Sequence, residues 1–175
     1  DGADGADGAD GADGADGADN ADRKANSDDR AAAIAALTTA LLDDRADVRA
    51  EACASLGELG ATDLLAEIVR RLDDGEPMVR QAAAIALGTL RHPGAVPPLL
   101  TALRDGPADL RFQAATSLAE IDPVRAVPAL LDAIHDRDPQ VVSAIVLALG
   151  GLDAGQAVGA IAGTLDHSDP AVRFD

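Results

Sequence analysis

Residues 77–104, PMVRQAAAIALGTLRHPGAVPPLLTALR, contain two apolar patterns with helical spacing. The first starts at Val79 and continues at i+4, i+8 and i+11, which indicates one buried face of a helix of about 13 residues. The second runs from about residue 95 to 104, and its Pro97 falls in the first turn, where a missing N–H costs little. Residues 92–94 (His-Pro-Gly) predict a turn between the two helices. A single helix pair cannot hide its apolar face, so neighbouring pairs must stack.

The same pattern recurs along the chain at a period of 31 residues. An arginine column contains Arg49, Arg80, Arg111 and Arg173. Two apolar columns contain Leu56, Leu87, Leu118 and Leu149, and Leu41, Leu72, Leu103, Ile134 and Leu165. Self-similarity at a fixed period of this size is the signature of a stacked array. We therefore predict an all-α fold, an α-solenoid of about four helix pairs over residues 30–175.

The repeat resembles the HEAT-repeat superfamily, in particular the short bacterial and archaeal form named after phycocyanobilin lyases. The matching residues are Pro77-Met78-Val79-Arg80, Ala83, Ala86-Leu87-Gly88, Ala95-Val96-Pro97, Leu99-Leu100 and Leu103. The resemblance covers residues 30–175 and implies that the second helix of each pair lines a concave surface. It says little about activity, because function does not follow from fold.

Residues 1–29 form a low-complexity acidic tail that begins with six copies of Asp-Gly-Ala. Such a segment has little apolar surface to bury and its like charges repel, so we expect it to be extended or disordered. The array in residues 30–175 opens on half a unit, and residues 169–175 begin a first helix without completing it. We expect either that the chain is part of a longer array or that its open face stacks on another molecule.

The formal net charge of −17 limits the classes of partner. A phosphate backbone or an anionic membrane surface would be repelled, so we expect neither nucleic acid nor membrane as a partner. No apolar run approaches the length that spans a bilayer. Cys53 is the only cysteine, so no disulfide forms within the chain, and the cytoplasm is only a default location.

The arginine column is accompanied by an aspartate column at the same period. We interpret the two columns as a structural ladder consisting of Asp43, Arg49, Asp74, Arg80, Asp105, Arg111, Asp136 and Arg173. The aspartates lie at the turn into the next helix, where a carboxylate can accept N–H groups of the helix start and pair with an arginine. In the family that the chain resembles, such pairs form a structural ladder between repeats.

Other residue types that often carry chemistry do not form a recognisable site. The three histidines (His92, His135 and His167) occupy different repeat positions, whereas a metal site needs converging ligands. Iron-binding HEAT-type hydroxylases use His-Glu pairs, and this sequence has none. Cys53 stands in a column of apolar residues, which indicates a buried thiol. We therefore predict no catalytic residue, no metal site and no cofactor.

The polar positions of the second helices differ from unit to unit, as a protein-binding surface requires. The candidate partner-binding residues are Glu67, Arg70, Arg71, Thr101, Asp132 and Asp166. They predict a non-enzymatic protein-binding scaffold or adaptor with a protein partner. The incomplete end units leave open a second hypothesis, a structural subunit of a polymer that self-associates through its open ends. The resemblance implies a third, a phycobilin lyase-like chromophore-handling protein or accessory subunit, against which the scarcity of aromatic residues argues.

Overall fold

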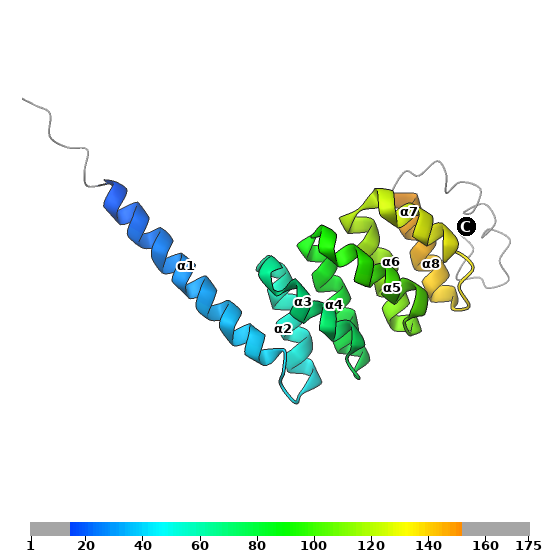
Figure 1. The fold of residues 1–175 in the computed structure, drawn as a ribbon, viewed down its shortest axis with the longest axis horizontal. Coiled ribbons are helices and arrows are strands. Elements are labelled where there is room, and N and C mark those ends of the chain that lie inside the picture. Colours follow the sequence, from blue (N-terminus) through cyan, green and yellow to red (C-terminus); the bar gives the residue numbers. More distant parts are fainter. Residues whose placement is uncertain (1–14, 152–175) are drawn as a thin grey trace, which may run out of the picture. The chain divides into compact units, whose positions relative to one another are not determined.

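A computed structural model describes the backbone of residues 15–151 and the side chains of residues 26–122 and 126–151. Within this range the chain consists of α-helices, three short 3-10 helices and connecting turns (Figure 1). The elements are α1 (Ala15–Ala40), α2 (Ala46–Glu58), η1 (Thr62–Leu64), α3 (Leu65–Arg70), η2 (Arg71–Asp73), α4 (Pro77–Leu90), η3 (Pro93–Ala95), α5 (Val96–Asp105), α6 (Ala108–Ile121), α7 (Pro123–Asp132) and α8 (Pro139–Gly151). The predicted all-α class is confirmed.

The helices alternate between a row of first helices and a row of second helices. The first helices α2, α4, α6 and α8 begin at Ala46, Pro77, Ala108 and Pro139, so the structural period equals the sequence period. They pack in chain order, α2 on α4, α4 on α6 and α6 on α8, while α5 and α7 each pack on α6 (Figure 1). The predicted α-solenoid is confirmed, and the described residues contain three helix pairs and the first helix of a fourth.

Helix α4 shows how the sequence sets the bounds of a first helix. It begins at Pro77, in the first turn, where the missing N–H of proline is not needed. It ends at Leu90, because Arg91 adopts a left-handed conformation with φ of 48° and donates its N–H to the carbonyl of Gly88. The buried face between these ends includes Val79 and Leu87, as the apolar spacing predicts.

Close contact between successive first helices depends on small residues. An added Cβ at Gly57 of α2 would lie 2.9 Å from the Cα of Ala86 in α4. One unit later, an added Cβ at Gly88 would lie 2.9 Å from the Oγ of Ser117 in α6. The Ser117 hydroxyl is buried and donates to the Ala84 carbonyl at 2.9 Å. Glycine at the end of a first helix therefore allows two helix backbones to approach each other.

The conformation of the N-terminal segment differs from the prediction. Helix α1 begins at Ala15, so the second half of the segment expected to be extended or disordered is helical. Helix α1 contains a single glycine, Gly17, near its start, and it leads into the alanine-rich residues 31–36. Glycine disfavours a helix, and alanine is the best helix former. The expectation for residues 1–14 lies outside the described residues. The chain divides into two units, Asp1–Ala36 and Leu37–Asp175, and all helix pairs belong to the second.

Candidate functional site

The first and last arginines of the described column, Arg49 and Arg111, each form a bidentate ion pair with an aspartate of the next unit. Arg49 donates from Nε and Nη2 to the carboxylate of Asp74 at 2.9 and 2.8 Å. Its Nη1 donates to the backbone carbonyls of Asp43 and Asp44, in the turn before its own helix. The guanidinium therefore links the turn that begins one unit to the turn that begins the next.

The second pair repeats this geometry two units later. Arg111 donates from Nε and Nη2 to the carboxylate of Asp136, both at 2.7 Å, and from Nη1 to the Gly106 carbonyl at 2.9 Å. The side chain of Arg111 is 5% exposed and that of Asp136 is 12% exposed. Each aspartate also accepts a hydrogen bond from the backbone N–H two residues later: Asp136 from Asp138, and Asp74 from Glu76.

The pairing lowers the pKa of both carboxyl groups. For Asp74, the hydrogen bonds from Arg49 are the largest cause of the lowered pKa, and burial opposes them. For Asp136, burial is the largest single influence and acts to raise the pKa. The hydrogen bonds from Arg111 and from the N–H of Asp138, together with nearby positive charge, outweigh it and leave the pKa lowered. Both groups are therefore more acidic in the folded chain than in the unfolded chain.

This shift predicts a specific loss of stability in acid. A carboxyl group whose folded pKa is below its unfolded value of about 3.9 stabilises the fold above that pH. That contribution is lost as the pH falls through the folded-state pKa. We expect the thermal midpoint of an Asp136→Asn protein to fall less between pH 5 and pH 2 than that of the unmodified chain. Thermal unfolding followed by circular dichroism measures this difference, with exposed Asp132→Asn as the control. Equal pH dependence in all three proteins would contradict the prediction.

The middle rung of the ladder departs from this pattern. Arg80 donates from Nη1 to the carbonyls of Asp74 and Gly75, as the other arginines do to their own turns. Its Nη2 donates to the carboxylate of Asp109 at 2.9 Å, and its buried Nε has no hydrogen-bond partner in the described structure. Asp105 stands 25 residues after Arg80, as Asp74 does after Arg49, but it instead accepts from the Nε of Arg104 at 3.0 Å.

The cause of this departure is the residue two positions after Asp105. In the intact rungs that residue supplies a backbone N–H to the aspartate, but here it is Pro107, which has none. Without this anchor the Asp105 side chain is exposed on the surface beside Arg104. The assignment of Asp105 to the ladder is therefore corrected, and Asp109 replaces it. Arg173 lies outside the described residues.

Removing the proline tests this explanation. In a Pro107→Ala background, Asp105 regains a backbone N–H and can turn toward Arg80. We expect Asp105→Asn to change the unfolding free energy little in the unmodified chain but to cost about 1–2 kcal/mol in the Pro107→Ala background. Urea unfolding of the four proteins of this cycle measures the coupling. Additive effects would show that Pro107 does not keep Asp105 out of the ladder.

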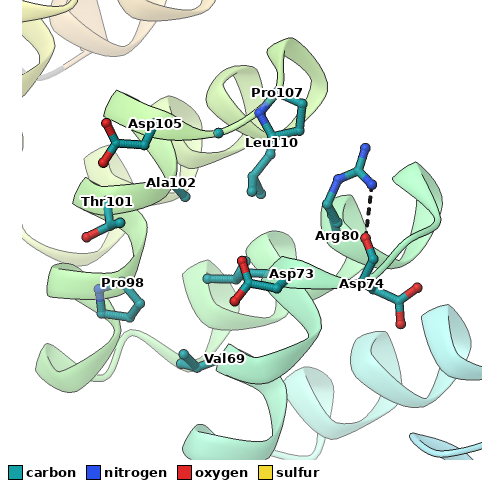
Figure 2. Close-up of a pocket in the computed structure, with 12 residues that line it drawn as sticks. Val69, Asp73, Asp74, Arg80, Pro98, Thr101, Ala102, Asp105, Pro107 and Leu110 are labelled. Atoms are coloured by element: carbon teal, nitrogen blue, oxygen red, sulfur yellow. Dashed lines mark hydrogen bonds between the residues drawn. The ribbon is translucent and has the colours of Figure 1, made fainter.

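A groove of about 660 Å³ opens beside the broken rung (Figure 2). Figure 2 shows Val69 and Asp73 on one side of it and Pro98, Thr101 and Asp105 of α5 on the other. Apolar lining residues are Val69, Leu72, Pro98, Ala102, Pro107 and Leu110. Polar lining residues are Asp73, Asp74, Arg80, Thr101 and Asp105. We call this groove, between the second helices of two units, the first groove.

The next unit contains an equivalent second groove of about 420 Å³. It is lined by Leu100, Leu103, Arg104, Ala129, Asp132, Ala133, His135 and Asp136. All of these residues except His135 lie 31 positions after a residue that lines the first groove. The two grooves are therefore one feature of the repeat, present at successive junctions of the second-helix row with different side chains.

The structure distributes the candidate partner-binding residues among different roles. Thr101 lines the first groove and its hydroxyl donates to the Pro97 carbonyl at 3.2 Å, while exposed Asp132 lines the second groove. Glu67 and Arg70 pair with each other at 3.7 Å on α3 and line neither groove. Asp166 lies outside the described residues.

Arg71 belongs to the packing between units rather than to an open surface. Its Nη1 donates to the Leu41 carbonyl at 3.2 Å and lies 3.7 Å from the Asp74 carboxylate, and its side chain is only 22% exposed. The interpretation of Arg71 as a partner-binding residue is therefore corrected. Sequence reasoning missed Asp73, Arg104 and His135 as groove residues, although the 31-residue columns place Asp73 and Arg104 at one equivalent position.

Cys53 is fully buried, and burial raises the pKa of its thiol to about 11. A thiol with this pKa is protonated at neutral pH and is a poor nucleophile. Among residues 26–122 and 126–151, no group of three or more His, Cys, Asp or Glu side chains is arranged to hold a metal ion. No helix of the described part is long and apolar enough to cross a membrane.

The burial of Cys53 predicts its reactivity. We expect the thiol to react with a disulfide reagent such as 5,5′-dithiobis(2-nitrobenzoate) only when the chain unfolds, because the reagent cannot reach a side chain with no exposed surface. The labelling rate should rise steeply across the urea unfolding transition. Stoichiometric labelling of the native protein within minutes at neutral pH would contradict this expectation.

Comparisons with known proteins agree with this architecture. A family model described as HEAT repeats matches residues 34–119 and 96–175. The complex of CpcE and CpcF of phycocyanin lyase from Nostoc sp. contains a similar chain, with 26% identity and a TM-score of 0.64 over 78% of this chain and 59% of that one. An engineered protein has the same fold, with 19% identity and a TM-score of 0.56 over 80% of this chain and 74% of that one. No match is found among curated proteins.

Proposed function

Because the chain belongs to the HEAT-repeat family, we propose that it is a non-enzymatic scaffold that binds a protein partner on its second-helix face. The observation that carries this proposal is the pair of equivalent grooves on that face. The ladder and the small-residue contacts between first helices repeat as a frame, while the groove side chains change from unit to unit. A fixed frame that presents variable side chains suits recognition of an extended surface.

Two further observations support a binding role over a catalytic one. The only thiol is buried and protonated at neutral pH, so it does not act as a nucleophile. The similar chain from Nostoc sp. forms a complex of two proteins, CpcE and CpcF. Association of this chain with a second protein is consistent with that precedent.

Photo-crosslinking at two matched threonines tests the scaffold. Thr101 on α5 and Thr89 on α4 are both exposed, and each donates its hydroxyl to the carbonyl four residues earlier. We expect benzoylphenylalanine at position 101 to form a discrete adduct in an extract of the source cells, and the same residue at position 89 to form none. The adducted protein, once purified, should bind the unmodified chain and lose affinity for Thr101→Arg but not for Thr89→Arg. Equal adducts from both positions, or none from position 101, would count against the scaffold.

A second candidate function follows from the similarity to the phycocyanin lyase complex, which extends over 78% of this chain. In this alternative the chain is a chromophore-handling subunit that works together with a partner chain. Incubation with a bilin and an apo-phycobiliprotein subunit, followed by absorbance spectroscopy, separates the two functions. A lyase-like protein speeds the appearance of a protein-bound bilin band, whereas the scaffold leaves its rate at the level without the chain.

A further inference from the structure

We propose that the two grooves together bind an extended polypeptide segment, with a lysine or arginine side chain in the first groove and an apolar side chain, three residues away, in the second. This inference rests on the proposed function and names the chemistry of the partner segment. It follows from the charge of each groove and from the helix-packing step that separates successive units.

The first groove has a net negative charge. Its Asp74 is neutralised by Arg49, and its Arg80 by Asp109, so these charges are internal to the fold. Asp73 and Asp105 remain, and both are exposed at the groove. Asp105 contacts Arg104, but the two side chains are 59% and 73% exposed, and an exposed pair of this kind contributes little stability. A cation from a partner can therefore replace Arg104 at Asp105.

The apolar part of the first groove suits the stem of a long basic side chain. Val69, Leu72 and Pro98 line the same groove as the two acidic side chains. Lysine and arginine place a methylene stem against apolar surface while the charged end reaches polar groups. The net charge of −17 on the whole chain adds a long-range attraction for a basic segment.

The second groove has no such excess of negative charge. Its Asp136 is bound by Arg111, and its remaining charged residues, Arg104 and Asp132, have opposite signs. Leu100 and Leu103 contribute apolar surface to its lining. An apolar side chain of the partner therefore fits this groove better than a charged one, since the charges of Arg104 and Asp132 balance and a charged group would lose hydration there.

The spacing of the grooves selects an extended segment and a separation of three residues. Equivalent positions of successive units are one helix-packing step apart, about 8–10 Å. A polyproline II segment advances about 9 Å in three residues and presents residues i and i+3 on the same side. In a β-strand, residues on one side are about 7 Å or 13 Å apart, which matches the step less well.

Fluorescence anisotropy with designed peptides tests the inference. The probes are fluorescein-labelled dodecapeptides of proline and alanine that carry one lysine and one leucine three residues apart, in both orders. Control peptides replace the lysine by glutamate or move the leucine to a separation of two residues. We expect the better of the two lysine probes to bind at least about tenfold more tightly than either control. Equal affinities, or no binding of any probe, would overturn the inference.

Variants of the chain identify the groove that binds the charged side chain of the probe. We expect Asp73→Asn together with Asp105→Asn to weaken binding of the lysine probe by about tenfold and to leave a norleucine version of the probe unaffected. Glu58→Gln on α2 removes an exposed charge far from both grooves in the repeat and should change affinity less than twofold. All substituted residues are exposed, and thermal unfolding confirms that each variant folds. An equal effect of Glu58→Gln would show that the preference reflects net charge alone and overturn the inference.

The outcomes separate this inference from the scaffold function. A partner crosslinked from position 101, combined with probes that show no preference for lysine or for the three-residue separation, leaves the scaffold in place and refutes the basic extended segment. In the opposite case, the lysine probes bind and depend on Asp73 and Asp105, but no protein is crosslinked from position 101. That result supports the groove chemistry and refutes the scaffold function in that extract.

Discussion

Arg111→Ala is expected to lower the free energy of unfolding by about 3–5 kcal/mol, the cost of removing one partner from a buried ion pair. Arg111 is 5% exposed, and its three nitrogens hold both oxygens of Asp136 and the carbonyl of Gly106. Alanine at this position leaves the Asp136 carboxylate and the Gly106 carbonyl without these bonds in a part of the structure that water reaches poorly. Urea unfolding followed by circular dichroism at pH 7 measures the loss.

Three further substitutions separate the ion pair from the loss of side-chain volume. Arg104→Ala removes an arginine from an exposed pair and should cost less than about 1 kcal/mol. Arg111→Lys keeps the charge but lacks the planar fork, so we expect an intermediate loss. The double change Arg111→Leu with Asp136→Leu should recover part of the stability, because no unpaired charge remains. A loss for Arg104→Ala as large as that for Arg111→Ala would mean that the ladder does not stabilise the fold.

Gly57→Ala is expected to destabilise the chain by about 1–3 kcal/mol, although alanine is the better helix former. The new Cβ would lie 2.9 Å from the Cα and 3.1 Å from the Cβ of Ala86, so two helix backbones must separate to accept it. This separation disturbs the packing of α2 on α4 along their contact. Thermal and urea unfolding of the purified variant measure the change.

Gly150→Ala provides the matched control, since Gly150 stands in the same repeat column as Gly57 and within helix α8. An added Cβ at Gly150 has no atom within 4 Å in the described structure. We expect this variant to be as stable as the unmodified chain, or more stable by up to about 1 kcal/mol through helix propensity alone. If both glycine variants changed stability in the same direction, close helix contact at Gly57 would not explain the requirement for glycine.

Most of the fold follows from local patterns in the sequence. Helical spacing of apolar residues such as Val79 and Leu87 indicates the buried faces, and proline and glycine mark the ends of the helices. The 31-residue period extends this local information along the chain, because each unit contacts mainly its neighbours. The burial of Cys53 follows from its apolar column in the same way.

The helical start of α1 at Ala15 shows that the prediction of an extended or disordered tail was wrong for residues 15–29. The acidic repeat with glycine indicates an extended segment, but glycine ends at Gly17 and alanine continues. Because α1 has no glycine after Gly17, the helix that contains the alanine-rich residues 31–36 extends back to Ala15.

The repeat, the order of its helices and an arginine–aspartate ladder could all be predicted from the amino-acid sequence, because they depend on spacing that recurs every 31 residues. The partner of each arginine and the polar residues that line a groove became visible only in the folded chain. The reason is that both depend on side-chain direction: Pro107 leaves Asp105 without an N–H to hold it, and Arg71 turns inward to Leu41. Residue columns predict position along a helix, whereas the contacts of a long polar side chain depend on its neighbours in space.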